Sequence, residues 1–187
     1  MTFQGFSIPS IWLYNCVSFM GRQAKLPTRS GEGPFYFVGR DGDGIRVDGE
    51  NIGASQIEQV LARHPDVVIA AVYAVPDPTL GDRVMAALQL REGAEFNAQA
   101  LAQFLSEQDD FGSKWMPSFF RIADALPLTQ TSKVIKKPLR QEKWRCADPV
   151  WWQQNTSDPW CPLTAGSIEE WERGFIERGR GDALEFG

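Results

Sequence analysis

Residues 39–52, GRDGDGIRVDGENI, contain four acidic side chains and four glycines, a composition that could bind calcium, cradle a phosphate or form a hinge. An EF-hand calcium loop beginning at Asp41 would need an oxygen ligand at its fifth position, glycine at its sixth and glutamate at its twelfth. Those positions hold Ile45, Arg46 and Ile52. The calcium interpretation is therefore excluded, and the residues by themselves indicate a Gly/Asp turn of a β-hairpin.

Other residue types that often do chemistry are sparse. There is no Walker A sequence, and no G-x-G-x-x-G follows a strand and opens a helix, so these nucleotide-binding loops are not indicated. His64 is the only histidine, and its place before Pro65 favours a cap at the C-terminal end of a helix over a catalytic or metal-binding role. The acids Asp109 and Asp110 are expected in a solvated loop.

A run of basic residues lies in the last third of the chain. It could bind phosphate groups or an acidic partner, or it could form the solvated face of a helix, and the sequence leaves both interpretations open. Its members are Lys133, Lys136, Lys137, Arg140, Lys143 and Arg145.

The composition narrows the class of protein. The chain has 187 residues, of which 43% are hydrophobic and 23% charged, as is typical of a soluble globular protein with a real core. Its net charge of −5 argues against non-specific attraction to nucleic acid or anionic membranes. The widely spaced Cys16, Cys146 and Cys161 indicate reduced thiols in the cytoplasm. Residues 1–20 lack a basic start and contain polar interruptions, so we expect neither a signal peptide nor a transmembrane segment.

Hydrophobic periodicity predicts the elements that would position these residues. The predicted strands are 35–38 and 45–47, paired as a hairpin, followed by 67–75, 83–90 and 118–124. The predicted helices are one with a Ser55–Glu58 capping box and Ile57, Val60 and Leu61 on its buried face, then 97–108, 134–144 and 167–179.

This order predicts an α+β fold, in which a β-hairpin is followed by a three-stranded sheet with flanking helices. We expect an atypical segment at 1–33, the regular domain at 34–144 and a Trp-rich C-terminal extension at 145–187. In that extension, Ile168, Trp171, Phe175 and Ile176 share one helical face and are expected to pack on the domain.

Three blocks between residues 36 and 140 change the interpretation of the hairpin. They read YFVGRDGDGIRVDGENIGASQIEQVLARHP, AAVYAVPDPTLGDRVMAAL and LPLTQTSKVIKKPLR. Together, and in this order, they resemble the C-terminal domain of the adenylate-forming (AMP-binding) acyl-CoA synthetase family. The resemblance spans more than half of the chain and is far more specific than any single block.

The resemblance implies roles for three basic residues. Arg40 matches the family arginine that contacts the nucleotide, and Arg46 occupies the next basic position of the same nucleotide-binding motif. Lys133 matches the lysine that reaches the substrate carboxylate and the α-phosphate during adenylation. An ammonium group suits that task because the reacting phosphorus centre is highly anionic.

The resemblance also assigns the hinge and the coenzyme passage. Gly42 takes the hinge position, where the family usually has Asp or Lys, and Asp43 follows it. Gly49 matches the glycine beside the pantetheine arm of CoA, where a side chain would obstruct the ligand. A second departure is TSK, rather than TGK, at residues 131–133.

The implied function is that of a fatty-acid–CoA ligase that uses ATP and CoA, with Mg²⁺ bound outside this domain. The motif combination is closest to the fatty-acid-transport and very-long-chain acyl-CoA ligase branch. Because residues 1–33 cannot hold the family's phosphate loop and acyl pocket, we expect a fragment that binds fatty acid, ATP and CoA through a missing N-terminal domain and is inactive alone. The alternative is a non-catalytic remnant or protein-interaction module derived from the domain.

Overall fold

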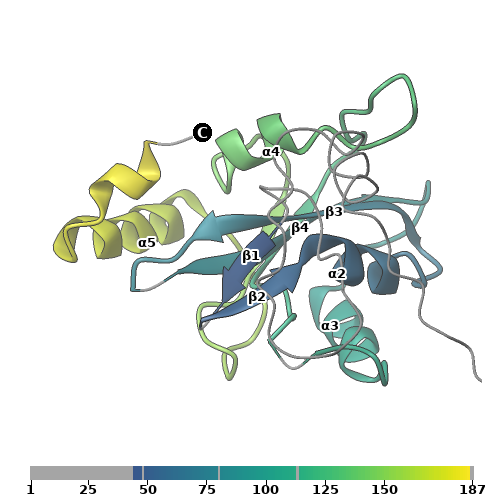
Figure 1. Ribbon diagram of the computed structural model, residues 1–187, viewed down its shortest axis with the longest axis horizontal. Coiled ribbons are helices and arrows are strands. Elements are labelled where there is room, and N and C mark those ends of the chain that lie inside the picture. The colour runs from purple at the N-terminus through teal and green to yellow at the C-terminus, as the bar shows by residue number, and fades with distance from the viewer. Residues whose placement is uncertain (1–43, 48, 80, 113, 186–187) are drawn as a thin grey trace, which may run out of the picture.

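The computed structural model describes residues 44–185 except 48, 80 and 113 (Figure 1). Arg40, Gly42, Asp43, the predicted strand 35–38 and the segment 1–33 lie outside the described residues.

The described part begins with a hairpin of β1 (Gly44–Val47) and β2 (Glu50–Gly53). Gly44 pairs with Gly53 and Val47 with Glu50, which leaves residues 48 and 49 between the strands. Within the described residues, 45–47 thus pairs with β2, a strand that was not predicted; the predicted partner, 35–38, lies outside the described residues, so that pairing stays a prediction. An Asp-Gly dipeptide favours a two-residue hairpin loop, and Gly49 has the positive φ of +81° that such loops require.

Helix α2 (Ala54–Leu61) follows directly from β2. The predicted capping box is wrong, because Gly53 is the N-cap and makes no side-chain hydrogen bond. The Glu58 carboxylate instead accepts a hydrogen bond from the backbone N–H of Val72 at 2.8 Å. His64 lies beyond the end of the helix and accepts a hydrogen bond from the backbone N–H of Asp66 at 3.2 Å, so the predicted cap is also wrong.

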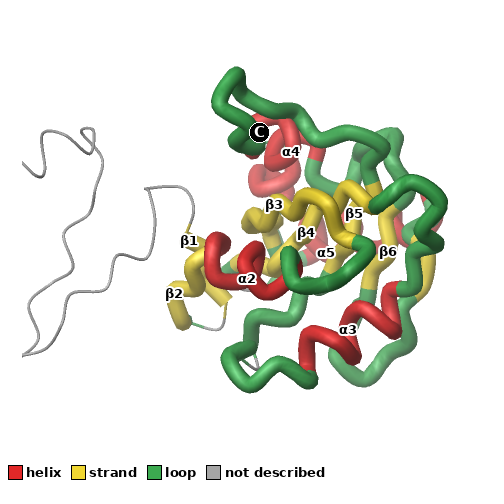
Figure 2. The backbone as a smooth tube through the Cα atoms, turned by 90° about the vertical axis from the view of Figure 1, so that its right-hand side faces the viewer, coloured by secondary structure: helices red, strands yellow, loops and turns green. Residues whose placement is uncertain are grey.

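The main sheet has five strands in the order β3 (Val67–Pro76), β4 (Asp82–Leu90), β5 (Phe119–Ile122), β6 (Val150–Trp152) and β7 (Cys161–Pro162). Figure 2 shows the first four side by side in this order. The β4–β5 pair is parallel and the other pairs are antiparallel. The predicted α+β class and the first three strands are confirmed, and the Trp-rich segment adds two short strands that were not predicted.

Helices cover both faces of this sheet (Figures 1 and 2). Helix α3 (Ala98–Ser106) lies below it in Figure 1, whereas α4 (Lys136–Glu142) lies above it. Helix α5 (Ala165–Glu177) and the 3₁₀ helix η1 (Gly181–Leu184) follow β7. Neighbouring residues of β3 point into opposite cores. Val72 packs with α2 and α3, whereas Tyr73 packs with an aromatic cluster that comprises Phe119, Trp144, Trp152, Trp171 and Phe175.

The aromatic cluster joins the C-terminal segment to the sheet. Phe175 is fully buried and Trp171 is 6% exposed, as the helical pattern predicted. Ile176, predicted on the same face, is instead 68% exposed.

In the loop after α3, both carboxylate oxygens of Asp110 accept hydrogen bonds from Arg63, at 2.7 and 2.6 Å, so this acid is not merely solvated.

Candidate functional site

Lys133 ends a tightly hydrogen-bonded loop between β5 and α4. Its carbonyl accepts a hydrogen bond from the backbone N–H of Thr129 at 2.8 Å, and its own N–H donates to the Thr129 hydroxyl at 3.1 Å. Leu128 and Val134 pair as an isolated antiparallel bridge, and the Ile135 N–H donates to the Pro127 carbonyl at 2.8 Å. The loop backbone is therefore fixed while the Lys133 side chain remains exposed.

Ser132 explains the departure from TGK in physical terms. Its φ of +58° lies in the left-handed region that glycine adopts without cost. A non-glycine residue there stores about 1–2 kcal/mol of strain. Ser132 therefore adopts the backbone conformation that glycine favours at this position.

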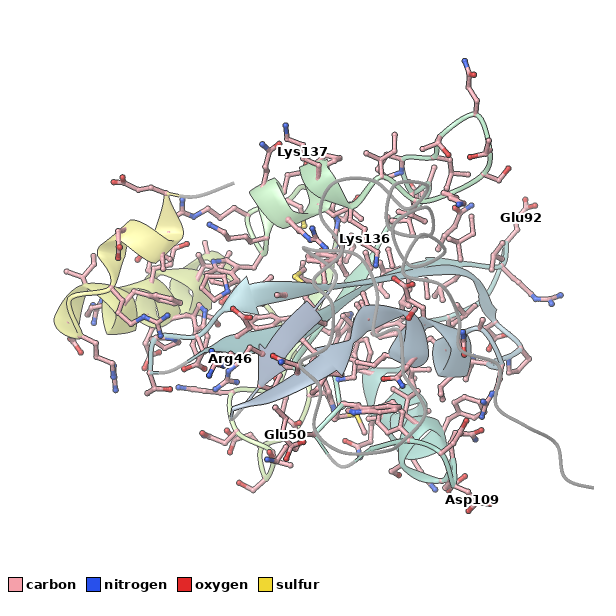
Figure 3. All side chains as sticks on the ribbon, viewed as in Figure 1. Arg46, Glu50, Glu92, Asp109, Lys136 and Lys137 are labelled. Atoms are coloured by element: carbon pink, nitrogen blue, oxygen red, sulfur yellow. The ribbon has the colours of Figure 1, made fainter. Side chains whose placement is uncertain are left out.

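The basic run after Lys133 is mostly structural. Lys136 pairs with Glu58 at 2.8 Å, and Arg145 pairs with Glu172 at 2.6 Å. Lys143 is only 7% exposed and donates to the carbonyls of residues 183 and 184 at 3.1 and 3.2 Å. Burial, with a further contribution from the charge of Arg145, lowers the pKa of Lys143. Figure 3 shows Lys137 pointing away from α4, so the run forms neither a continuous phosphate patch nor a uniformly solvated face.

The hairpin carries the other described candidates, Arg46 and Gly49. The Arg46 side chain is exposed, and its backbone N–H donates to the Asp82 carboxylate at 3.2 Å. A Cβ added to Gly49 would meet nothing within 4 Å, so its positive φ, and not crowding, is what favours glycine. In Figure 3, Arg46 and Glu50 lie to the lower left of Lys136 and Lys137.

A groove of about 650 Å³ adjoins the hairpin. It is lined by Val47 of β1, the β3–β4 turn, the segment from Lys114 to Ser118 and the β6–β7 loop at 153–156. Lys114 reaches across to Glu50 of β2 with a contact of 2.7 Å. No sequence pattern indicates this groove, because its lining comes from four separate segments.

Asp77 and Arg83 form the most buried ion pair of the groove, at 2.6 Å. Burial opposes ionisation of Asp77, but hydrogen bonds from Thr79 and Arg83 outweigh it and lower the pKa of this carboxyl. Arg83 also donates to the Gln154 carbonyl at 2.7 Å. The charges on both side chains are therefore committed to holding the β3–β4 turn.

The structure does not bring all candidates together. In Figure 1 the loop before α4 lies at the upper right, whereas the turn between β1 and β2 lies at the lower left. Arg46 and Gly49 share the hairpin, and Lys133 belongs to the distant loop. One molecule therefore presents two separate faces.

Comparison with known proteins identifies the domain that carries these residues. The family model described as the AMP-binding enzyme C-terminal domain matches residues 56–133. This stretch is an AMP-binding enzyme C-terminal domain. Lys133 is the last residue of the match. The hairpin with Arg46 and Gly49 ends at Gly53, shortly before the first matched residue.

Similarity to curated relatives covers a longer stretch of the chain than the domain match. The medium/long-chain-fatty-acid–CoA ligase FadD17 of Mycobacterium tuberculosis is 53% identical over 126 residues, covering 67% of this chain and 25% of the relative. The steroid-22-oyl-CoA synthetase of Rhodococcus jostii is 50% identical over 118 residues, covering 63% of this chain and 21% of the relative. The chain thus spans about a quarter of the length of the curated relatives it matches.

Solved structures show the same domain. The Brucella canis acyl-CoA synthetase aligns with a TM-score of 0.51 and 32% identity, covering 58% of this chain and 20% of that protein. A Mycobacterium tuberculosis fatty acyl CoA synthetase aligns with a TM-score of 0.51 and 27% identity, covering 58% and 21%. The AMP-binding C-terminal domain of this chain therefore has the fold found in acyl-CoA synthetases.

Among the residues that the structure describes, no helix is long and apolar enough to cross a membrane. Within the same residues, no group of three or more His, Cys, Asp or Glu side chains could hold a metal ion.

Proposed function

We propose that this chain works as the C-terminal domain of an AMP-forming fatty-acyl-CoA ligase. In the first half-reaction, a fatty acid and ATP give an acyl adenylate and pyrophosphate. In the second, the CoA thiol displaces AMP and the thioester forms. The 53% identity to a medium/long-chain-fatty-acid–CoA ligase supports a fatty acyl substrate.

The observation that carries the proposal is the exposed Lys133 on a fixed loop. The charge that develops on the α-phosphate is stabilised best by a cation whose position is set before the reaction. The backbone hydrogen bonds with Thr129 provide that position, and the flexible side chain provides reach. The ammonium of Lys133 would thus bind the substrate carboxylate and the α-phosphate, while the acyl pocket belongs to a larger partner domain.

The hairpin would serve the second half-reaction. The open surface at Gly49 lets a thin pantetheine arm pass close to the backbone, and the exposed Arg46 offers a cation for the nucleotide. Arg40 would add a nucleotide contact, and Gly42 and Asp43 would form the hinge. Those three lie outside the described residues.

Mg²⁺, as a cofactor for ATP, would be bound outside this domain, as the family resemblance implies. The contribution of this chain is limited to binding and orienting substrates and to stabilising charge.

A complementation assay tests the proposal. The chain is mixed with the separately produced large domain of the FadD17 relative, and fatty-acid-dependent exchange of pyrophosphate into ATP is measured. Exchange should rise above that of the large domain alone, and Lys133→Ala should reduce it about 10²–10³-fold. Thioester formation from a supplied acyl adenylate should change far less.

Lys137→Ala is the matched control, because this exposed lysine lies close in sequence and on the following helix. It should leave both half-reactions near wild type. An absence of complementation, or equal losses in the two half-reactions for Lys133→Ala, would contradict the proposal.

A further inference from the structure

The Trp-rich C-terminal segment (145–187) contacts the β3–β4 turn (77–81) and the neighbouring Arg83 through the side chains of Arg180 and Trp171. Arg180, just before η1, donates a hydrogen bond from its guanidinium to the Asp77 carbonyl at 2.6 Å. The guanidinium carbon of Arg83 lies 4.7 Å from the centroid of the Trp171 ring, within the range of a cation–π interaction. Figure 1 shows α5 alongside this end of β3 and β4.

Several contacts hold Asp77 in place at the start of the turn. Asp77 is 5% exposed and its carboxylate contacts Arg83 at 2.6 Å and the Thr79 hydroxyl. The backbone N–H of Thr79 donates to the same carboxylate at 2.6 Å. The Asp77 backbone N–H also donates to the Gly81 carbonyl at 3.3 Å, so a displacement of Asp77 acts directly on Gly81 across the turn.

The opposite side of the same turn holds the hairpin. Asp82 accepts the hydrogen bond from the backbone N–H of Arg46 at 3.2 Å. A Cβ placed on Gly81 would lie 2.8 Å from the Arg46 carbonyl, so glycine permits this close approach of the two backbones. Gly81 also has a φ of +69°, which other residues adopt only with strain.

We propose that the C-terminal segment, through Arg180 and the β3–β4 turn, positions the hairpin that carries Arg46 and Gly49. The segment lies outside the residues matched by the family model, 56–133, so the matched domain does not account for this role. Its catalytic meaning rests on the proposed function, because the hairpin would face CoA and the nucleotide in the second half-reaction. The mechanical link itself does not depend on any activity.

Amide hydrogen exchange of the full chain, measured by mass spectrometry without substrates, tests the link separately from the function. Arg180→Ala should increase exchange in peptides covering 44–53 and 77–82 about three- to tenfold, the change expected when one ordinary hydrogen bond is lost. Peptides from α3 should not change, because none of the contacts that link Arg180 to the hairpin involves that helix.

Arg178→Ala is the matched control. Arg178 is two positions away, but its guanidinium donates to the Gly174 carbonyl of its own helix at 3.1 Å. This variant should leave the hairpin peptides at the wild-type rate. Arg180→Lys retains a cationic donor and should return the rate towards wild type.

A second perturbation enters from the other end of the link. Asp82→Ala removes the acceptor of the Arg46 N–H and should increase exchange of the hairpin without affecting α5. The double variant Arg180→Ala/Asp82→Ala should exchange at the hairpin little faster than either single variant, because both substitutions break the same chain of contacts. Additive effects, no rescue by Arg180→Lys, or increased exchange confined to 165–185 would overturn the inference.

Discussion

Phe175→Ala tests whether the C-terminal segment shares one cooperative core with the sheet. The Phe175 ring is fully buried in α5, 6.0 Å between centroids from Trp144 and 5.9 Å from Trp171. Removing it deletes the transfer free energy of a buried aromatic side chain, about 1.5–3 kcal/mol, and leaves a cavity. Two aromatic pairs, each worth about 0.5–1.5 kcal/mol beyond the buried area, are lost as well.

These contributions overlap, so we expect a decrease of about 3–5 kcal/mol in the free energy of unfolding. Urea unfolding followed by tryptophan fluorescence measures it, since Trp144, Trp152 and Trp171 belong to this cluster. Ile176→Ala is the adjacent control: its side chain is 68% exposed, and the change should stay within about 0.5 kcal/mol.

The result that would refute this reasoning is a loss below about 1 kcal/mol for Phe175→Ala with an unchanged slope against urea. A separate early transition, with the rest of the chain unfolding at the wild-type midpoint, would likewise show that α5 is attached to the sheet without sharing its core.

Two further predictions concern ionisable groups. Burial raises the pKa of the Cys146 thiol, so iodoacetamide should modify the exposed Cys161 first, as peptide mass spectrometry would show; faster labelling of Cys146 would contradict this. Burial lowers the pKa of Lys143, so the unfolded state binds more protons at this site, and stability should rise as the pH increases through the folded pKa towards 10.5. Urea unfolding at about pH 7 and pH 9.5 should show a smaller rise for Lys143→Met than for wild type, and an equal rise would contradict the assignment.

The elements predicted from the sequence are those with long, uniform patterns. Strands at 67–75 and 83–90 were evident because continuous β-branched and small apolar residues fit a strand buried on both faces. Strand β6, with three residues, and β7, with two, are too short to show any period. They form because β5 offers a free edge to Trp151 and Trp152, a tertiary condition that no local pattern contains.

The capping box failed for a related reason. Ser55 and Glu58 have the spacing of a box, but the Glu58 carboxylate is claimed by the Val72 N–H and by Lys136, which lie far away in the sequence. A tertiary ion pair at a partly buried position outweighs a local cap worth about 1 kcal/mol. The burial of Lys143 could not be predicted for the same reason, because its hydrogen-bond acceptors are carbonyls of η1, about forty residues further along the chain.

The candidate site was predictable only through its motifs. Lys133 and Gly49 came from the resemblance, and the structure adds the reasons those positions are usable: a fixed loop at one and a positive φ on an open surface at the other. The groove beside the hairpin depends on the β6–β7 loop folding against the β3–β4 turn. Its existence could not be read from a chain whose last strands were themselves not recognised.

The separation of the two faces constrains any mechanism that uses both. Lys136, three residues after Lys133, is held by Glu58 of α2, and the hairpin is held to the β3–β4 turn at Asp82. Both faces are thus attached to one closely packed domain, so neither moves far without the other. If Lys133 and Gly49 serve the same reaction centre in successive half-reactions, the whole domain must turn relative to that centre between them. The ion pair of Lys136 with Glu58 and the hydrogen bond of the hairpin to Asp82 then matter, because they keep the conformation of each face unchanged while the domain turns as a rigid body.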